Sequence, residues 1–390
     1  MSLISFQEFF AGLLRRSKPA TGRRCQAVIL SLLLTLSSGQ LFAHHQTYRI
    51  GVFTTRSAAD AFWGPVEQFM RAASADLDME LQVFYAEDDH ISLIRQVEAT
   101  ARARPRFDAL VLPNFKKTAH RNIKAAEANQ VPVLLFNSGL SAERAPQMGK
   151  PREKYPYWIG SILPDEQRAG ADLLNWLLAK AQSKTPEVET AAPVLAIGGN
   201  LGDFASIERT QGLKLALARQ DKFQLAQLVH AGWQRQRAAE MFGHLIKRFP
   251  GNPVAPRVVW AASDLMALGT LDGAKEAGVT IIAGGVDWTR AGLSSVLDGG
   301  LSVSFGGHFM DGGWAAVMLY DYFHGVDFAS ESVSMVTQMA PLDVDNKDQI
   351  GMLLGSPTWE RVDFKVFSKF LNPSLKQYPF NPQSVFLQLQ

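Results

Sequence analysis

The chain has 390 residues, of which 39 are basic and 37 acidic, so its formal net charge is +2. This near balance, without long basic runs, argues against a nucleic-acid partner. The single cysteine, Cys25, lies near the N-terminus, so the chain after it can form no disulfide, thiolate metal site or thiol nucleophile.

The first 43 residues have the pattern of a secretory signal peptide. Basic side chains precede an apolar run over residues 27–36, and Ala43 ends a signal-cleavage sequence. This run is too short for a bilayer span, which needs about 20 residues. An uncleaved anchor is the alternative, because weakly polar residues extend the run to Ala43. Cleavage would remove five basic and one acidic side chain, leaving an exported protein with a formal net charge of −2.

The segment Tyr48–Ala73 predicts a strand, a polar loop and a helix. Asp60 can cap that helix, which opens with the aromatic pair Phe62 and Trp63. Two aromatic rings at a strand-to-helix junction either pack into the core or face a partner. We therefore expect this junction to form one apolar wall of a ligand site.

The rest of the chain alternates short apolar runs with amphipathic stretches. The predicted strands are Arg49–Phe53, Leu81–Tyr85, Ala109–Leu112, Val133–Phe136, Trp158–Ile162, Val194–Ile197, Leu225–Val229, Val258–Ala261, Thr280–Ala283 and Leu301–Phe305. The predicted helices include Ser92–Arg102, Lys117–Ala128, Asp165–Ala181, Ile207–Ala218, Arg235–Arg248 and Leu265–Ala277. This alternation is typical of α/β proteins with parallel sheets. Because about six strands fill one such sheet, we expect two domains, separated within residues 141–157.

In open α/β sheets, ligands bind beyond the carboxyl ends of the strands. The residues predicted there are aromatic or hydrogen-bonding: Phe62, Trp63, Asn114, Asn137, Ser138, Asn200, Asp203, Arg209, Trp233, Ser263, Asp264, Asp287, Trp288 and His308. Aromatic rings stack on the C–H faces of a sugar, while amide, carboxylate and guanidinium groups bind its hydroxyls. The competing interpretation is that the rings pack in the core, that Arg209 forms a surface ion pair and that Asp264 caps a helix.

The sequence lacks the motifs of common catalytic sites. Gly198–Gly202 fits neither a dinucleotide fingerprint nor a P-loop and indicates a tight turn. No GxSxG or HExxH motif occurs. In Asp88-Asp89-His90, Asp89 is better explained as a helix cap than as a metal ligand. We therefore expect no catalytic residue, metal or cofactor, although catalytic groups converging only in space would escape this reading.

The strand-to-helix junctions, taken in order, resemble those of the type I periplasmic binding proteins, particularly the ribose-binding protein and the autoinducer-2 receptor. The resemblance runs from about Tyr48 to Gly325. It rests on Asp60-Ala-Phe-Trp63, Val131-Pro-Val-Leu-Leu-Phe-Asn137-Ser138, Glu208-Arg209-Thr-Gln-Gly212, Trp233, the segment Ala261–Gly269, and Gly285-Val-Asp287. In this family the matching segments include residues that contact the ligand.

The resemblance implies two Rossmann-like lobes with parallel sheets, joined by a hinge of three crossovers near Tyr155, Gly307 and Thr337. The expected N-terminal lobe comprises residues 46–154 and 308–336, and the C-terminal lobe comprises 155–307 and 337–390. The expected ligand-binding residues are Asp60, Phe62, Trp63, Asn137, Ser138, Arg209, Trp233, Ser263, Asp287, Trp288 and His308.

The resemblance also implies a function. We expect a monomeric, non-enzymatic protein of the periplasm that captures a sugar or sugar-like molecule by hinge closure and delivers it to an ABC transporter permease. The alternative is a receptor subunit for a membrane sensor kinase. Ribose itself is not expected, because Asn137-Ser138 replaces the Asp-Arg pair of the pentose binder and Ser263 replaces an asparagine. The second arginine of the autoinducer-2 receptor has no assigned counterpart, and His308 is the candidate to replace it.

Overall fold

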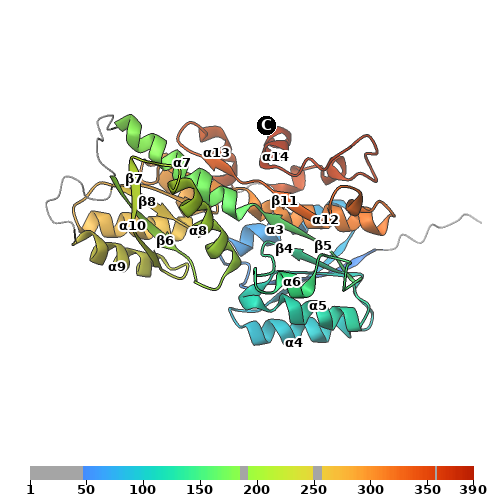
Figure 1. The fold of residues 1–390 in the computed structure, drawn as a ribbon. Helices are drawn as coiled ribbons and strands as arrows, with labels where there is room; N and C mark the ends of the chain where they lie inside the picture. Colours follow the sequence, from blue (N-terminus) through green and yellow to red (C-terminus); the bar gives the residue numbers. More distant parts are fainter. Residues whose placement is uncertain (1–46, 185–191, 249–256, 356–357) are drawn as a thin grey trace, which may run out of the picture. The chain divides into compact units, whose positions relative to one another are not determined.

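The computed structural model describes residues 47–184, 192–248, 257–355 and 358–390. The predicted signal peptide, with Cys25, lies outside these ranges. Residues 47–390 form one compact unit (Figure 1). Among the described helices, none is long and apolar enough to cross a membrane.

The first of two sheets has the strand order β11-β5-β4-β3-β1-β2, and all its pairs are parallel. Its strands are β1 (Arg49–Thr54), β2 (Glu80–Tyr85), β3 (Ala109–Leu112), β4 (Val133–Phe136), β5 (Trp158–Pro164) and β11 (Ser334–Thr337). The accompanying helices are α3 (Trp63–Asp76), α4 (His90–Ala101), α5 (Ala119–Ala128), α6 (Ala145–Met148) and α12 (Asp311–Phe323), with 3-10 helices η1 (Phe115–Lys117) and η3 (Phe328–Ser330).

The second sheet has the order β12-β10-β9-β8-β6-β7 and is parallel except for the pair β10–β12. Its strands are β6 (Ala192–Gly198), β7 (Phe223–His230), β8 (Val258–Ala261), β9 (Ile282–Val286), β10 (Val303–Gly306) and β12 (Ala340–Leu342). Its helices are α7 (Glu166–Lys184), α8 (Phe204–Leu217), α9 (Arg235–Ile246), α10 (Asp264–Glu276) and α11 (Arg290–Leu297). The predicted α/β class with two parallel-sheet lobes is confirmed.

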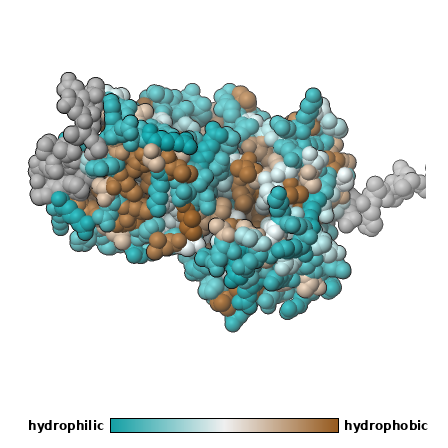
Figure 2. All heavy atoms as spheres, viewed as in Figure 1, coloured by the Kyte–Doolittle hydropathy of each residue, from teal (hydrophilic) through white to brown (hydrophobic). Residues whose placement is uncertain are grey.

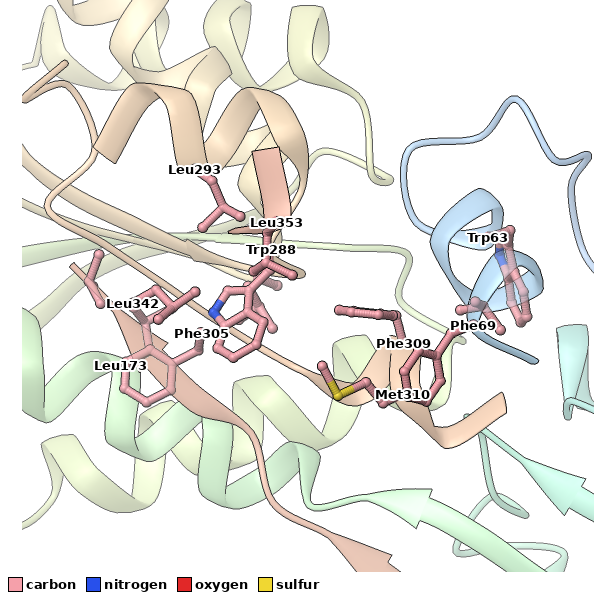
Figure 3. Packing of buried hydrophobic residues seen from close by; sticks show 14 of the residues in the cluster. Trp63, Phe69, Leu173, Trp288, Leu293, Phe305, Phe309, Met310, Leu342 and Leu353 are labelled. Carbon is pink, nitrogen blue, oxygen red and sulfur yellow. The ribbon is translucent and has the colours of Figure 1, made fainter. Parts of the chain in front are cut away.

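Helix α3 shows how the apolar pattern becomes packing. Val66, Phe69, Met70 and Ala73 recur at helical spacing and are all buried. The Phe69 ring meets Trp314 of α12 edge-on, with ring centroids 5.4 Å apart. Figure 3 shows Phe69 beside Phe309 and Met310, which continue the packing toward the second sheet. The face of the molecule seen in Figure 2 is mostly hydrophilic, with apolar atoms gathered around the edge strand β7.

The described chain passes between the two sheets at three places. These are the β5–α7 junction, the β10–α12 junction, which contains 3-10 helix η2 (His308–Met310), and the β11–β12 junction. The last two agree with the crossovers expected near Gly307 and Thr337. The first does not follow the expectation, because β5 pairs with β4 and β11 and so belongs to the first sheet.

The misplaced first crossing has a physical explanation. Residues 141–157 have no periodicity because they form an ordered loop of the first lobe, which contains the short helix α6, and not a linker between lobes. Arg152 holds this loop in place by donating hydrogen bonds of 2.5 and 2.9 Å to the Asp327 carboxylate and of 2.6 Å to the Ile159 carbonyl. The chain then forms β5 in the first sheet before it crosses to the second lobe.

The C-terminal region also departs from the expected assignment of residues 337–390 to one lobe. Helix α13 (Lys347–Leu354) packs against α11 of the second lobe. The 3-10 helices η4 (Trp359–Arg361) and η5 (Phe364–Phe367) instead pack against α3 of the first lobe. The last helix, α14 (Pro382–Leu389), returns to the second lobe, where Phe386 packs against Trp288.

Candidate functional site

A cavity of about 570 Å³ lies where the carboxyl ends of the two sheets face each other. Ten of the eleven residues predicted to bind ligand line it: Asp60, Phe62, Trp63, Asn137, Ser138, Arg209, Trp233, Ser263, Asp287 and His308. They come from both lobes, as strand ends of parallel sheets should.

The aromatic wall comes from the start of α3. The Asp60 carboxylate accepts hydrogen bonds of 2.9 Å from the backbone N–H groups of Phe62 and Trp63, so it fixes both rings at the helix start. The half-buried Phe62 ring stacks on His308, with centroids 4.8 Å apart. Trp63 is only 8% exposed and meets Phe136 edge-on. Phe62 is therefore the more accessible ring, and Trp63 mainly supports it.

The loop after β4 supplies an unused amide. Asn137 has a left-handed backbone (φ 61°), which costs energy outside glycine and is tolerated best by asparagine. Its side chain makes no hydrogen bond to the described residues. Ser138 and Asn114 are occupied structurally, since the Ser138 hydroxyl accepts from the Asn114 backbone N–H at 2.9 Å. Asn137 therefore keeps its whole amide free, whereas the Ser138 hydroxyl already accepts one bond.

At the base of the cavity, Arg209 is 3% exposed and uses all five of its N–H donors. Two bonds reach the Glu166 carboxylate at 2.5 and 3.1 Å, and others reach the Ala262 carbonyl at 2.6 Å and Asp287 at 3.1 Å. The fifth reaches the Nε2 atom of His308 at 3.2 Å, which makes that nitrogen an acceptor. Arg209 was expected to hold ligand directly; in this structure it organises the groups that surround it.

The charge of Arg209 is secured by its neighbours. Burial alone would lower the pKa of its guanidinium, but Glu166 and Asp287 outweigh burial and raise the pKa above its ordinary value. Glu166 is the partner that the sequence analysis missed. Glu166 lies between the predicted strand Trp158–Ile162 and the body of the predicted helix Asp165–Ala181, so the strand-end rule could have included it, but its partner Arg209 is 43 residues away in the sequence.

Asp287 sits on a turn of unusual backbone geometry. Both Asp287 (φ 120°) and Trp288 (φ 53°) have positive φ values. Such strain outside glycine concentrates at functional sites. The Asp287 side chain is 15% exposed, and its Oδ1 atom faces Arg209, with no described partner at Oδ2.

Trp288 does not line the cavity. Its ring is 5% exposed, its indole N–H donates to the Ser304 carbonyl at 2.9 Å, and it packs against Phe386. Figure 3 shows it among Leu293, Phe305 and Leu353. The reversed backbone at Asp287 and Trp288 turns consecutive side chains to opposite sides, so the carboxylate meets the cavity and the ring meets the core.

Asp264 stabilises the turn at Asp287 and Trp288 through hydrogen bonds to neighbouring residues. Its carboxylate accepts from the Thr289 backbone at 2.8 Å and from the Ser304 hydroxyl at 2.7 Å. Gly285 permits this approach, because a Cβ there would lie 2.8 Å from the Asp264 backbone. Gly284 and Gly285 also explain why the predicted strand ended at Ala283, whereas β9 runs to Val286. Burial, reinforced by the charge of Asp287, raises the pKa of Asp264 from 3.8 to about 8.

This shift predicts a pH-dependent stability. Between about pH 4 and 8 the folded carboxyl of Asp264 keeps a proton that the unfolded chain has lost, so stability falls as the pH rises, by up to about 1.4 kcal/mol per unit. Asp264→Asn should flatten this slope, measured by urea denaturation at several pH values. The control is Asp272→Asn, in a half-exposed pair with Arg235. Equal slopes for the two variants would contradict the assignment.

Trp233 forms part of the second wall. Its backbone is left-handed (φ 65°), and its indole N–H donates to Asp203 at 2.7 Å. A Cβ at Gly199 would lie 2.2 Å from the Trp233 ring, so the glycine is needed for ring packing. The glycine-rich turn Gly198–Gly202 therefore makes room for the Trp233 ring.

Ser263, which also lines the cavity, caps α10 by accepting from the Met266 backbone at 3.4 Å.

Besides Glu166, three charged lining residues were missed as ligand-site residues: Arg56, Asp88 and Lys116. Arg56 pairs with Asp88 at 2.9 Å and Asp60 at 3.2 Å, and Lys116 donates to the Asp88 carbonyl at 2.9 Å. Asp88 and Lys116 follow β2 and β3, so the strand-end rule should have included them. Asp88 was read only as the neighbour of Asp89, which does cap α4 by accepting from Ile91.

The balance of charge restricts the ligands that fit. Five carboxylates line the cavity (Asp60, Asp88, Glu166, Asp203 and Asp287) against three cations (Arg56, Lys116 and Arg209). Arg56 and Arg209 are paired with carboxylates, and Lys116 donates to a backbone carbonyl, so the excess of carboxylates disfavours an anionic ligand. The described residues contain no cluster of metal-binding side chains. A neutral, hydroxyl-bearing molecule suits the unused amide, the free carboxylate oxygen and the aromatic wall.

Comparison with known proteins agrees with this arrangement. A family model for the periplasmic binding protein domain matches residues 50–325. A periplasmic sugar-binding protein from Pseudomonas fluorescens has 30% sequence identity and a TM-score of 0.77, covering 87% of this chain and 99% of its own. No curated protein sequence matches the chain.

More distant structures share the fold. An ABC transporter solute-binding protein from Bacillus halodurans with bound myo-inositol has 18% identity and a TM-score of 0.64, covering 79% of this chain and 98% of its own. One from Actinobacillus succinogenes with bound D-allose has 16% identity and a TM-score of 0.65, covering 77% and 99%.

Proposed function

This chain belongs to the periplasmic binding protein domain family, whose members are solute-binding proteins, and we propose that it captures a neutral sugar or similar polyol for an ABC transporter. The observation that carries the proposal is the composition of the cavity. Phe62 offers a flat ring, Asn137 a free amide and Asp287 a free carboxylate oxygen, while both arginines are paired with carboxylates and acidic side chains outnumber basic ones.

Hinge closure is the proposed mechanism. Phe62 and Asn137 lie on the first lobe and Asp287 on the second, so a ligand that contacts all three stabilises the conformation in which the lobes are close. A membrane permease would then recognise the closed form. A sensor kinase would recognise the same form in the alternative role, and a permease and ATPase encoded beside this chain would favour transport.

The first test is equilibrium binding to the purified protein, read by tryptophan fluorescence. Neutral pentoses, hexoses and inositols are compared with uronic acids of the same ring size. We expect saturable binding at one site for at least one neutral compound, and binding at least tenfold weaker for its acid. No response to any sugar, tighter binding of the acid, or conversion of the ligand to a product would each overturn the proposal.

A matched pair of variants tests the role of Asn137. Asn137→Gly removes the amide but suits the left-handed backbone, so it should weaken binding about tenfold without loss of stability. Gln130→Gly is the control, because Gln130 also has a positive φ (55°) and lies outside the cavity lining. Equal affinities for the two variants would show that the Asn137 amide does not contact the ligand.

A further inference from the structure

Residues 358–390, called here the C-terminal strap, lie beyond the segment matched by the family model. The first part of the strap is anchored on the first lobe. The Phe364 backbone donates to the Asp76 carboxylate at 2.9 Å, and the Lys365 ammonium reaches the same carboxylate at 2.5 Å. The Phe364 ring meets Phe69 of α3 edge-on, with centroids 5.1 Å apart.

A buried carboxylate on α12 forms the second anchor. Asp321 is fully buried and accepts from the Ser368 hydroxyl, from the Lys369 backbone at 2.7 Å and from the Tyr378 hydroxyl at 2.8 Å. Nearby, Phe380 stacks on Trp314 with centroids 4.9 Å apart and ring planes 12° apart. The strap is thus held by the first lobe up to residue 380.

The end of the strap reaches the hinge and the second lobe. Asn381 caps α14 by accepting from the Ser384 backbone at 3.0 Å. Pro382 lies against the left-handed Gly307 (φ 99°), where a Cβ would be 2.4 Å from the proline ring. Phe386 packs against Trp288, with ring centroids 5.9 Å apart.

The contacts of α14 with Gly307 and with Trp288 involve residues that are adjacent in sequence to cavity residues. Gly307 precedes His308, which stacks on Phe62, and Trp288 follows Asp287, whose carboxylate faces Arg209. A rotation of the second lobe about the crossing at Gly307 moves the Trp288 turn relative to the anchors of the strap on the first lobe. Because the strap is fixed to the first lobe, such a rotation would strain either its anchors or the α14 contacts.

We propose that α14 is a brace that limits how far the two lobes open and positions Asp287 and His308 for ligand. Phe386 is the central positioning residue. Its ring is 3% exposed, and it touches the turn that carries Asp287, not the ligand. The part of the proposal that concerns ligand affinity rests on the proposed function; the part that concerns lobe opening does not.

The test measures lobe separation in the ligand-free protein. Spin labels are attached at Ile91→Cys and Leu201→Cys in a Cys25→Ser background; both positions are exposed, and they neighbour the cavity residues Asp88 and Asn200 on opposite lobes. We expect Phe386→Ala to shift the distance distribution to longer values and broaden it. Leu387→Ala, which alters a 62% exposed side chain of the same helix, should leave the distribution unchanged.

Binding of a sugar identified by the first test supplies a second readout. Phe386→Ala should weaken it at least fivefold, whereas Leu387→Ala should not. If Phe386→Ala fails to fold, Phe386→Leu keeps most of the volume and should show smaller changes in the same direction. A lower melting temperature with wild-type distances and affinity would mean that Phe386 is merely structural and would overturn the proposal. A shifted distance distribution without any sugar binding would instead support the brace and contradict the proposed function.

Discussion

Replacing Arg209 with alanine is expected to lower the free energy of unfolding by about 3–5 kcal/mol. The cause is the set of partners left behind. Glu166 is almost fully buried and loses both of its hydrogen bonds, while Asp287 and the Ala262 carbonyl lose a donor each. An uncompensated buried charge costs far more than an exposed one. Urea denaturation followed by circular dichroism would measure the loss.

Two further variants show whether the lost stability comes from the Glu166 carboxylate left without its cation. Arg235→Ala removes a half-exposed arginine from its pair with Asp272 and should cost less than about 1 kcal/mol. Adding Glu166→Gln to an Arg209→Met chain removes both charges and should restore part of the stability. If Arg209→Ala left the stability near that of the wild type while abolishing ligand binding, Arg209 would be a ligand contact, as the family resemblance implied.

The sequence was sufficient for the strands up to β10 and for most of the cavity wall, but β11 and β12 were not predicted. Strands such as β3, β4 and β8 were predicted to the residue because each is a short, fully buried apolar run. The strand-end rule then located Phe62, Asn137 and Asp287, because parallel strands bring their carboxyl ends to one edge of each sheet.

Features that depend on long-range packing were beyond the sequence. Trp288 and Asp287 are neighbours in the chain, and only their positive φ values send the ring into the core. Glu166 gains its role from a partner 43 residues away. The strap lacks periodicity because its residues pack singly into gaps of two lobes instead of forming one amphipathic face.

The two aromatic residues at the start of α3 should respond oppositely to truncation. Trp63 is 8% exposed and packs against Phe136, so Trp63→Ala is expected to cost about 3–5 kcal/mol of stability. Phe62 is half-buried at the cavity wall and makes one stacking contact with His308 in the neighbouring crossing. Phe62→Ala should therefore cost only about 1 kcal/mol of stability.

Affinity should follow the opposite order once stability is accounted for. Loss of the Phe62 ring removes the flat surface that a sugar would cover, and about 2 kcal/mol of lost contact corresponds to a roughly thirtyfold weaker dissociation constant. Trp63→Ala, assayed well below its melting temperature, should retain more affinity than Phe62→Ala. The reverse order would place the tryptophan against the ligand and show that the lobes rearrange on binding enough to uncover a ring that is buried here.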